Sequence, residues 1–226
     1  MLHISILTLF PDMFEGPFNQ SIIHRAIEKK IASIEYIDLR NYAADKYKSV
    51  DDHPYGGGHG MILRVDVIDH AIIDIKRRFH EKAHAILLDP QGITYSQSKA
   101  KELSRKNHII LICGHYETFD ERVRNLVDEE ISIGDYIVTG GEIPAMAVVD
   151  SVIRLLPNAL SKTQATNDES FSKPVLEYPQ YTRPLVYENR KVPAILLSGD
   201  HKKIDSWRQT QALARTKKRR PDLLKG

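Results

Sequence analysis

The fold is decided by the stretch Ser132-Ile-Gly-Asp-Tyr-Ile-Val-Thr-Gly-Gly-Glu-Ile-Pro-Ala-Met146. A short β-branched run leads into a pair of glycines, and Glu142, Ile143 and Pro144 then open an apolar segment with the composition of a buried helix. Glycine just before a helix and proline at its start are ordinary entry signals. The stretch therefore predicts a strand end, a tight loop and a helix in immediate succession.

Two earlier strand ends carry loops of the same kind. They are Leu87-Leu-Asp-Pro-Gln-Gly92 and Leu111-Ile-Cys-Gly-His-Tyr-Glu117. Glycine lets the backbone approach a neighbouring group closely, because it has no Cβ. Three such loops predict one pocket in which main-chain atoms, rather than side chains, hold a small molecule.

The composition is that of an ordinary soluble protein, with 42% hydrophobic and 27% charged residues among 226. This length suffices for one sizeable core and a smaller second unit. The single cysteine, Cys113, excludes an intramolecular disulfide framework and favours a reducing cytoplasm; its apolar strand predicts a buried hydrophobe rather than a nucleophile. The start of the chain lacks a basic region, and no apolar run reaches about 18 residues. We therefore expect a cytoplasmic protein with no membrane partner.

Strands and helices alternate along the first two thirds of the chain. Apolar runs predict strands, and helical spacing predicts helices, with a polar loop at 40–60. This alternation is typical of an α/β fold with a largely parallel sheet flanked by helices. Such a sheet predicts a ligand site beyond the carboxyl ends of its strands, where all three glycine loops fall. The expected strands are 4–9, 34–39, 85–88, 109–113 and 130–133, and the expected helices are 14–30, 65–79, 96–105, 119–127 and 143–156.

Three parts are expected in the chain. Residues 1–157 form the α/β domain, and residues 158–175, rich in Ser, Thr, Asn and Asp without periodicity, read as a flexible linker. Residues 176–226 form a small, mostly helical, basic domain. Between His201 and Arg220 there are eight Lys and Arg against one acid, Asp205, a net charge of +7. With Trp207 among them, this tail favours a nucleic-acid surface over a merely solvated helix end.

The loop Gly56-Gly-Gly-His-Gly60 is open to two interpretations. Its backbone N–H groups suit a phosphate, but the Lys-Ser/Thr of a P-loop is missing. A mobile surface loop and a substrate-facing loop both fit. His53 and His59 lie near two aspartates, but no Cys pair or His-Glu-x-x-His accompanies them, so no metal site is predicted.

Charged residues beside the third loop are equally ambiguous. Asp150 and Arg154 lie four apart on a helix that is otherwise apolar enough to be buried nearly all round. They form either an i,i+4 salt bridge or part of a functional site. Asp168 and Glu169, next to Phe171, are by themselves only solvated acids.

Taken together, these segments closely resemble the bacterial tRNA (guanine-N1)-methyltransferase family, which belongs to the knotted SPOUT methyltransferases. The matching pieces follow one order over nearly the whole chain. They are Thr8-Leu-Phe-Pro-Asp-Met-Phe14, Asp51–Met61, Leu88-Asp-Pro-Gln-Gly92, Cys113-Gly-His-Tyr-Glu117 with Asp120-Glu-Arg122, Ser132–Met146, Asp150-Ser-Val-Ile-Arg154, Ser170-Phe171, Pro179-Gln-Tyr-Thr-Arg-Pro184 and Leu196-Leu-Ser-Gly-Asp-His201.

The resemblance implies an N-terminal catalytic domain with a deep trefoil knot, an exception to the rule that chains do not thread their own loops. It also implies a homodimer with active sites at the subunit interface, and a C-terminal domain that helps to hold tRNA. The cofactor would be S-adenosylmethionine, bent into the knot. Its contacts would come from Leu88, Pro90, Gly92, Gly114, Tyr116, Glu117, Ile133, Gly134, Asp135, Tyr136, Ile137, Val138, Gly140, Gly141 and Pro144.

The implied substrate is the guanine at position 37 of tRNA, next to the anticodon. Its N1 carries a proton at neutral pH, so methylation at N1 needs a base as well as a methyl donor. A carboxylate suits removal of the proton, and a guanidinium suits the charge that develops on O6. Arg154 matches the family's arginine. Glu169 stands where the family commonly has Asp, which favours Glu169 as the base and leaves Asp168 as the alternative.

Some departures from the family pattern fall near the expected site. His59, His115 and the pair Thr118-Phe119 differ from the residues that the resemblance implies there. Two other functions fit the same sequence: a SPOUT methyltransferase that acts on another RNA site, and a non-catalytic RNA-binding protein. Whether Mg²⁺ assists cannot be read from the sequence.

Overall fold

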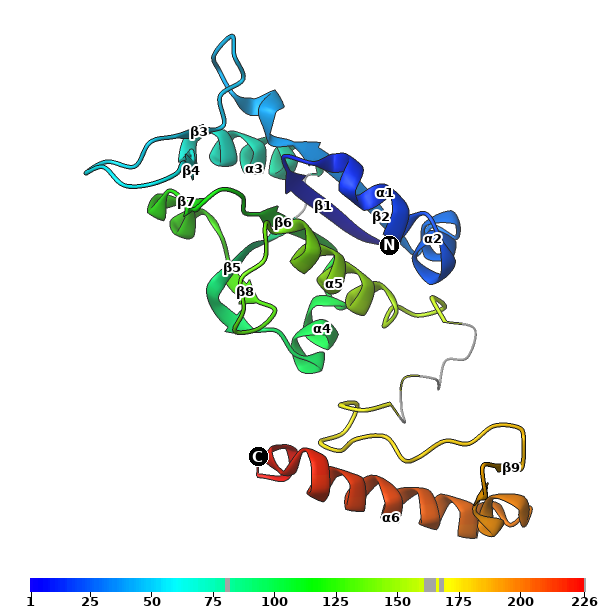
Figure 1. The fold of residues 1–226 in the computed structure, drawn as a ribbon. Helices are drawn as coiled ribbons and strands as arrows, with labels where there is room; N and C mark the ends of the chain where they lie inside the picture. The colour runs from blue at the N-terminus through cyan, green and yellow to red at the C-terminus, as the bar shows by residue number, and fades with distance from the viewer. Residues whose placement is uncertain (80–81, 161–165, 167–168, 226) are drawn as a thin grey trace. The chain divides into compact units, whose positions relative to one another are not determined.

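A five-stranded sheet, parallel throughout, forms the centre of the first of two units, Met1–Ser161 and Lys162–Gly226. The computed structural model describes residues 1–79, 82–160, 166 and 169–225 (Figure 1). The strand order β2-β1-β6-β5-β8 is fixed by parallel ladders between neighbours, as expected for an α/β fold. The strands are β1 Leu2–Thr8, β2 Ala32–Asp38, β5 His84–Thr94, β6 His108–Cys113 and β8 Glu129–Ser132.

Helices cover both faces of this sheet, which explains why β6 is buried along its whole length. One core contains side chains of α1 Glu15–Phe18, α2 Ser21–Glu28, α4 Gln97–Leu103 and α5 Glu142–Ile153. The other contains the buried side of α3 Val65–Phe79, whose bounds are those expected from its apolar spacing. Figure 1 shows α5 and α3 on opposite sides of the strands.

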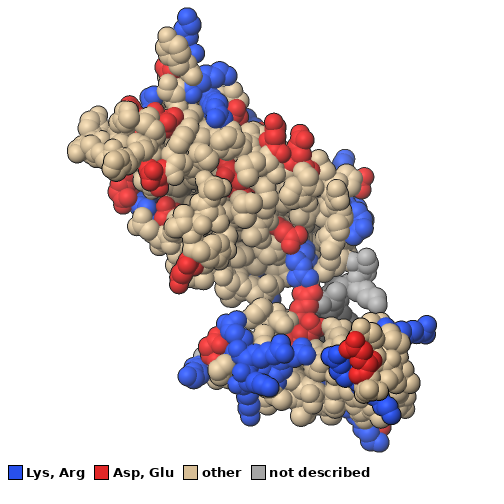
Figure 2. All heavy atoms as spheres, in the orientation of Figure 1, with Lys and Arg blue, Asp and Glu red and all other residues tan. Residues whose placement is uncertain are grey.

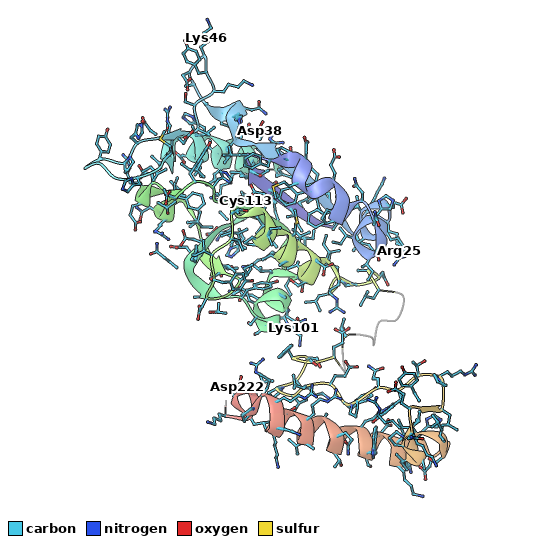
Figure 3. All side chains as sticks on the ribbon, viewed as in Figure 1. Arg25, Asp38, Lys46, Lys101, Cys113 and Asp222 are labelled. Carbon is cyan, nitrogen blue, oxygen red and sulfur yellow. The ribbon has the colours of Figure 1, made fainter. Side chains whose placement is uncertain are left out.

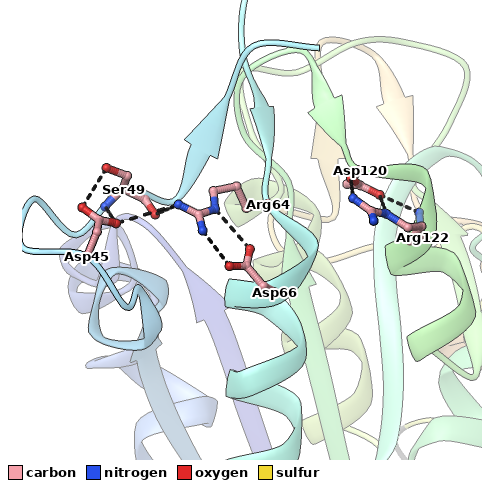
Figure 4. A network of polar contacts seen from close by, with 6 residues as sticks. All are labelled: Asp45, Ser49, Arg64, Asp66, Asp120 and Arg122. Carbon is pink, nitrogen blue, oxygen red and sulfur yellow. Dashed lines mark hydrogen bonds and ion pairs between the residues drawn. The ribbon is translucent and has the colours of Figure 1, made fainter. Parts of the chain in front are cut away.

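A small three-stranded sheet ties the polar loop to the main body. It consists of β3 Asp51–Asp52, β4 Ile62–Leu63 and β7 Thr118–Phe119. Beside it, Arg64 pairs with Asp66 at 2.6 Å and with Asp45 at 3.8 Å (Figure 4). The hydrogen bond from Arg64 lowers the pKa of Asp66, so this pair persists at neutral pH. The base of the loop is therefore anchored on both sides.

Two expected helices differ in the structure. The helix expected at 14–30 is broken into a 3₁₀ turn, Pro11–Phe14, followed by α1 and α2, because Gln20 is extended and Ser21 has a φ of +57°. The helix expected at 119–127 is instead β7 followed by a 3₁₀ helix, Glu121–Leu126. There Asp120 accepts hydrogen bonds from the backbone and side chain of Arg122, which tightens the turn (Figure 4).

Helix α5 was expected to be buried nearly all round, and this expectation was wrong. Ile143, Ala147 and Asp150, at helical spacing, lie exposed on one side. The apolar composition of the helix hid this side, because Ile and Ala there resemble the residues of the buried side. Ile143 and Ala147 therefore leave apolar side chains exposed on a core helix, next to the charged Asp150.

The second unit is built around one long helix, α6 His201–Arg219. Asp200 caps it by accepting a hydrogen bond from the backbone N–H of Lys203. The unit also contains a hairpin of β9 Val186–Tyr187 and β10 Arg190–Lys191 and the 3₁₀ turns 194–197 and 221–224. A further 3₁₀ turn, 39–42, belongs to the first unit. Lys and Arg gather over the C-terminal end of α6 (Figure 2), where 217–220 are all exposed. No helix in the described ranges has the length and apolar character required to span a bilayer.

Candidate ligand-binding site

The three glycine loops meet at one edge of the central sheet. They follow β5, β6 and β8, which are neighbours in the sheet, so their carboxyl ends lie side by side. The loops enclose a cavity in the first unit. Its lining residues are Leu88–Pro90, Gly114–Phe119, Ile131–Gly134, Tyr136–Gly141 and Pro144.

Glycines allow the loops to approach one another. A Cβ on Gly141 would lie 2.5 Å from the Cα of Cys113, and one on Gly92 would lie 2.4 Å from the carbonyl carbon of Glu130. Real Cβ atoms do not approach backbone so closely. The backbone N–H of Gly141 also donates a 2.7 Å hydrogen bond to the carbonyl of Gly114. The second and third loops are therefore in direct main-chain contact.

The first loop is held from behind by an ionic network. Arg124 lies 3.6 Å from the buried Asp89 and also pairs with Glu121 and Glu130. Asp89 in turn accepts a hydrogen bond from the backbone N–H of Gln91. A mostly buried arginine with three acidic partners is stabilised by charge on several sides and resists displacement. It fixes the turn Leu88–Gly92 against β8.

A buried carboxylate lies beneath the third loop. Glu142, the first residue of α5, accepts a 2.7 Å hydrogen bond from Thr8 at the end of β1. Cys113, labelled at the sheet in Figure 3, is buried as expected for a small hydrophobe. Burial and the nearby Glu142 carboxylate raise the pKa of the Cys113 thiol well above its usual value, so the thiol stays protonated and unreactive.

The rim of the cavity contains strained and aromatic residues. Tyr116 has a φ of +59°, a conformation that non-glycine residues adopt at a cost and that often occurs at ligand sites. Partial burial and the Asp51 carboxylate raise the pKa of Tyr116. The ring of His115 lies 4.8 Å from that of Phe10, and its Nδ1 is buried without a hydrogen-bond partner in the described part of the chain.

The Gly-rich loop reaches this rim at one end. The backbone N–H of Glu117 donates to the carbonyl of Met61, and a Cβ on Gly60 would overlap the Glu117 side chain. Tyr55, at the other end, is fully exposed. The loop thus has one end against the cavity wall and the rest in solvent. Within the described ranges, no group of three or more His, Cys, Asp and Glu side chains is arranged to hold a metal ion.

Most residues expected to contact the cofactor come together here. All of them line the cavity except Gly92, whose role in the structure is the close contact with β8, and Asp135. Sequence reasoning missed several lining residues, and all of these lie inside or next to the same three motifs. They are Asp89, His115, Thr118, Phe119, Ile131, Ser132 and Thr139.

Arg154 and Glu169 are not among the residues that line this cavity. Arg154 is the C-cap of α5 in the first unit and does not line this cavity. Glu169 belongs to the second unit, where it lines a different cavity. Asp168 lies outside the described residues.

A parallel α/β sheet with a glycine-lined cavity beyond its strand ends is the arrangement in which α/β proteins hold small-molecule ligands. The family model described as tRNA (Guanine-1)-methyltransferase TrmD matches residues 2–226. Three proteins named tRNA (guanine-N(1)-)-methyltransferase are similar along their lengths. That of Shouchella clausii is 52% identical over 225 residues (100% of this chain, 92% of the relative). That of Dictyoglomus turgidum is 50% identical over 224 residues (99% of this chain, 90% of the relative). That of Carboxydothermus hydrogenoformans is 53% identical over 225 residues (99% of this chain, 88% of the relative).

The chain therefore belongs to the tRNA (guanine-1)-methyltransferase family. Membership confirms the resemblance drawn from the motifs, and the parallel sheet with a helical C-terminal region confirms the expected SPOUT-type α/β fold.

Replacing Gly141 by alanine tests the close packing of the loops. We expect Gly141→Ala to lower the free energy of unfolding by about 1–3 kcal/mol, because the added Cβ meets rigid backbone. Urea unfolding followed by circular dichroism measures this change. Gly16→Ala is the control: open space surrounds Gly16, so its midpoint should move far less. Equal midpoints for the Gly141 variant and the unmodified protein would contradict the account.

Proposed function

We propose that this protein transfers a methyl group from S-adenosylmethionine to N1 of the guanine at position 37 of tRNA. One observation carries the proposal: a cavity walled by the main chain of three glycine loops, in a chain that matches the tRNA (guanine-1)-methyltransferase family over residues 2–226. The basic surface of α6 suits the phosphates of an RNA partner.

The cavity has the chemistry that S-adenosylmethionine requires. Gly114, Gly140 and Gly141 leave main-chain groups accessible to a planar base, while leucine, proline and valine side chains offer apolar surface. Glu117 adds a carboxylate for a cationic ligand. When bound, the donor supplies an electrophilic methyl group on a sulfonium. The residues present therefore fit this donor.

Methyl transfer to N1 needs a proton acceptor, and we assign that role to Glu169. Its carboxylate would accept the proton that N1 loses on methylation. Arg154 stabilises the negative charge that develops on O6. Asp168 is the alternative base. Holding the reacting atoms about 3–3.5 Å apart supplies much of the remaining acceleration.

The proposed working form is a cytoplasmic homodimer with each active site at the subunit interface. Support comes from apolar side chains exposed around the cavity: Ile137 is 82% and Ile143 47% exposed, and Ala147 continues the stripe on α5. A partner subunit would cover this surface and bring its Glu169 to the first cavity. We further propose that the third loop is threaded as a trefoil knot, which would explain its tight contact with Cys113.

The base specificity is tested with two tRNA transcripts that differ only at position 37. We expect methyl transfer from radiolabelled S-adenosylmethionine to the guanine transcript and none to the adenine transcript. The reason is that adenine has no proton on N1 for the base to remove and no O6 for Arg154 to contact. Undiminished transfer to the adenine transcript would refute the proposed target atom. Binding of both RNAs without any transfer would favour a non-catalytic RNA-binding protein.

The assignment of the base is tested by Glu169→Gln. We expect a loss in kcat of about 10²–10⁴-fold, because an amide cannot accept the proton. The affinity for S-adenosylmethionine, measured by calorimetry, should be unchanged. Asp168→Asn is the matched control and should remain near normal; the reverse pattern would move the assignment to Asp168.

Glu169→Gln also tests whether each active site takes residues from both subunits. Mixing inactive Glu169→Gln protein with inactive Arg154→Gln protein should restore partial activity if each site takes one residue from each subunit. No recovery after verified subunit exchange would argue that each subunit acts alone.

A further inference from the structure

The second unit contains a cavity of its own, between segment 169–178 and α6. It is walled by acidic, cationic, aromatic and apolar groups, among them Glu169, Tyr178, Arg208, Gln209 and Leu213. These residues are up to 44 positions apart in sequence, counted from Glu169 to Leu213. The fold of this unit alone brings them together.

The segment opposite α6 is fixed by hydrogen bonds. The backbone N–H of Leu176 donates to the buried hydroxyl of Thr216 at 2.8 Å, and Arg215 donates to the carbonyl of Glu177 at 3.1 Å. The N–H of Glu177 donates to the hydroxyl of Ser170. The walls are therefore held in place by the protein itself, as a specific site requires.

Arg208 and Lys173 are the cationic residues that line this cavity in the described part of the unit. The guanidinium of Arg208 lies 4.9 Å from the centre of the Tyr178 ring, and one terminal nitrogen lies 3.3 Å from Asp205. Its Nε is enclosed and has no hydrogen-bond partner in the described part of the chain. Such a stack on tyrosine holds the flat guanidinium in one orientation.

These groups match the edges of one nucleobase. Guanine presents an acceptor at N7, which suits a guanidinium, and donors at N1 and N2, which suit a carboxylate. Adenine presents an N6 donor beside N7, and pyrimidines have no N7. Unpaired RNA bases also stack on aromatic rings and on guanidinium planes.

We propose that this cavity binds the target guanine of tRNA, with Arg208 at N7 and Glu169 at the N1 edge. The inference rests on the proposed function and adds a recognition residue to it. Arg208 reads the imidazole side of the base and leaves the N1 edge to Glu169. Tyr178 and Asp205 hold Arg208 in position.

The test compares tRNA transcripts carrying guanine or 7-deazaguanine at position 37, in which a C–H replaces N7. We expect the unmodified protein to lose about tenfold in kcat/KM on the 7-deaza transcript, the size of one charge-assisted hydrogen bond. Arg208→Gln should lose a similar factor on guanine and show no further loss on 7-deazaguanine. Its affinity for S-adenosylmethionine should be unchanged.

Arg219→Gln, exposed on the same helix, is the matched control. This variant should lower kcat/KM by the same factor on both transcripts and keep the preference for guanine over 7-deazaguanine. Equal rates of the unmodified protein on the two transcripts would overturn this inference and leave the proposed function standing. That comparison does not depend on the folding of any variant. Discrimination that survives in Arg208→Gln would also overturn it. Absence of transfer to the guanine transcript would overturn the proposed function as well.

Discussion

The structure depends on the contact of bare backbone between loops at the end of a parallel sheet. Gly141 lies against Cys113 and Gly114, and Gly92 lies against β8, at distances that no side chain would permit. This packing aligns three strand ends and leaves main-chain groups on a shared cavity wall. The ionic network of Arg124 and the Thr8–Glu142 hydrogen bond then hold the first and third loops from outside the cavity. Side chains in this region serve mainly to fix the backbone.

The two units contribute different chemistry. The first offers glycine, apolar surface and the two acids Asp89 and Glu117 at the cavity, which suits a donor that needs to be held in one shape. The second contributes a carboxylate, a stacked arginine and an exposed basic helix end, which suit a nucleobase and its phosphates. An enzyme that joins a small donor to a large RNA benefits from this division, since each partner is recognised by its own surface. The proposed dimer would bring the two surfaces to one reaction centre.

Much of the first unit could be predicted from sequence because its signals are local. The apolar spacing predicts the bounds of α3, and the glycine loops predict the cavity without any knowledge of the sheet order. The two helix predictions that were wrong also have local causes. The extended Gln20 and left-handed Ser21 break the helix that apolar spacing favours at 14–30. At 119–127, the hydrogen bonds accepted by Asp120 produce a 3₁₀ helix instead. The cavity of the second unit could not be predicted, because Tyr178 and Arg208 belong to no shared motif and meet only through the packing of α6. Likewise, no pattern distinguishes the exposed Ile143 of α5 from its buried neighbours.

The central claim is that one small molecule is bound by the main-chain atoms of three separate loops. Hydrogen–deuterium exchange with and without saturating S-adenosylmethionine tests it directly, since backbone amides report the contact. We expect slower exchange in 88–92, 114–118 and 133–141 together, with the amides of α3 unchanged. Binding that is measurable by calorimetry yet protects only one of these loops, or none, would contradict it.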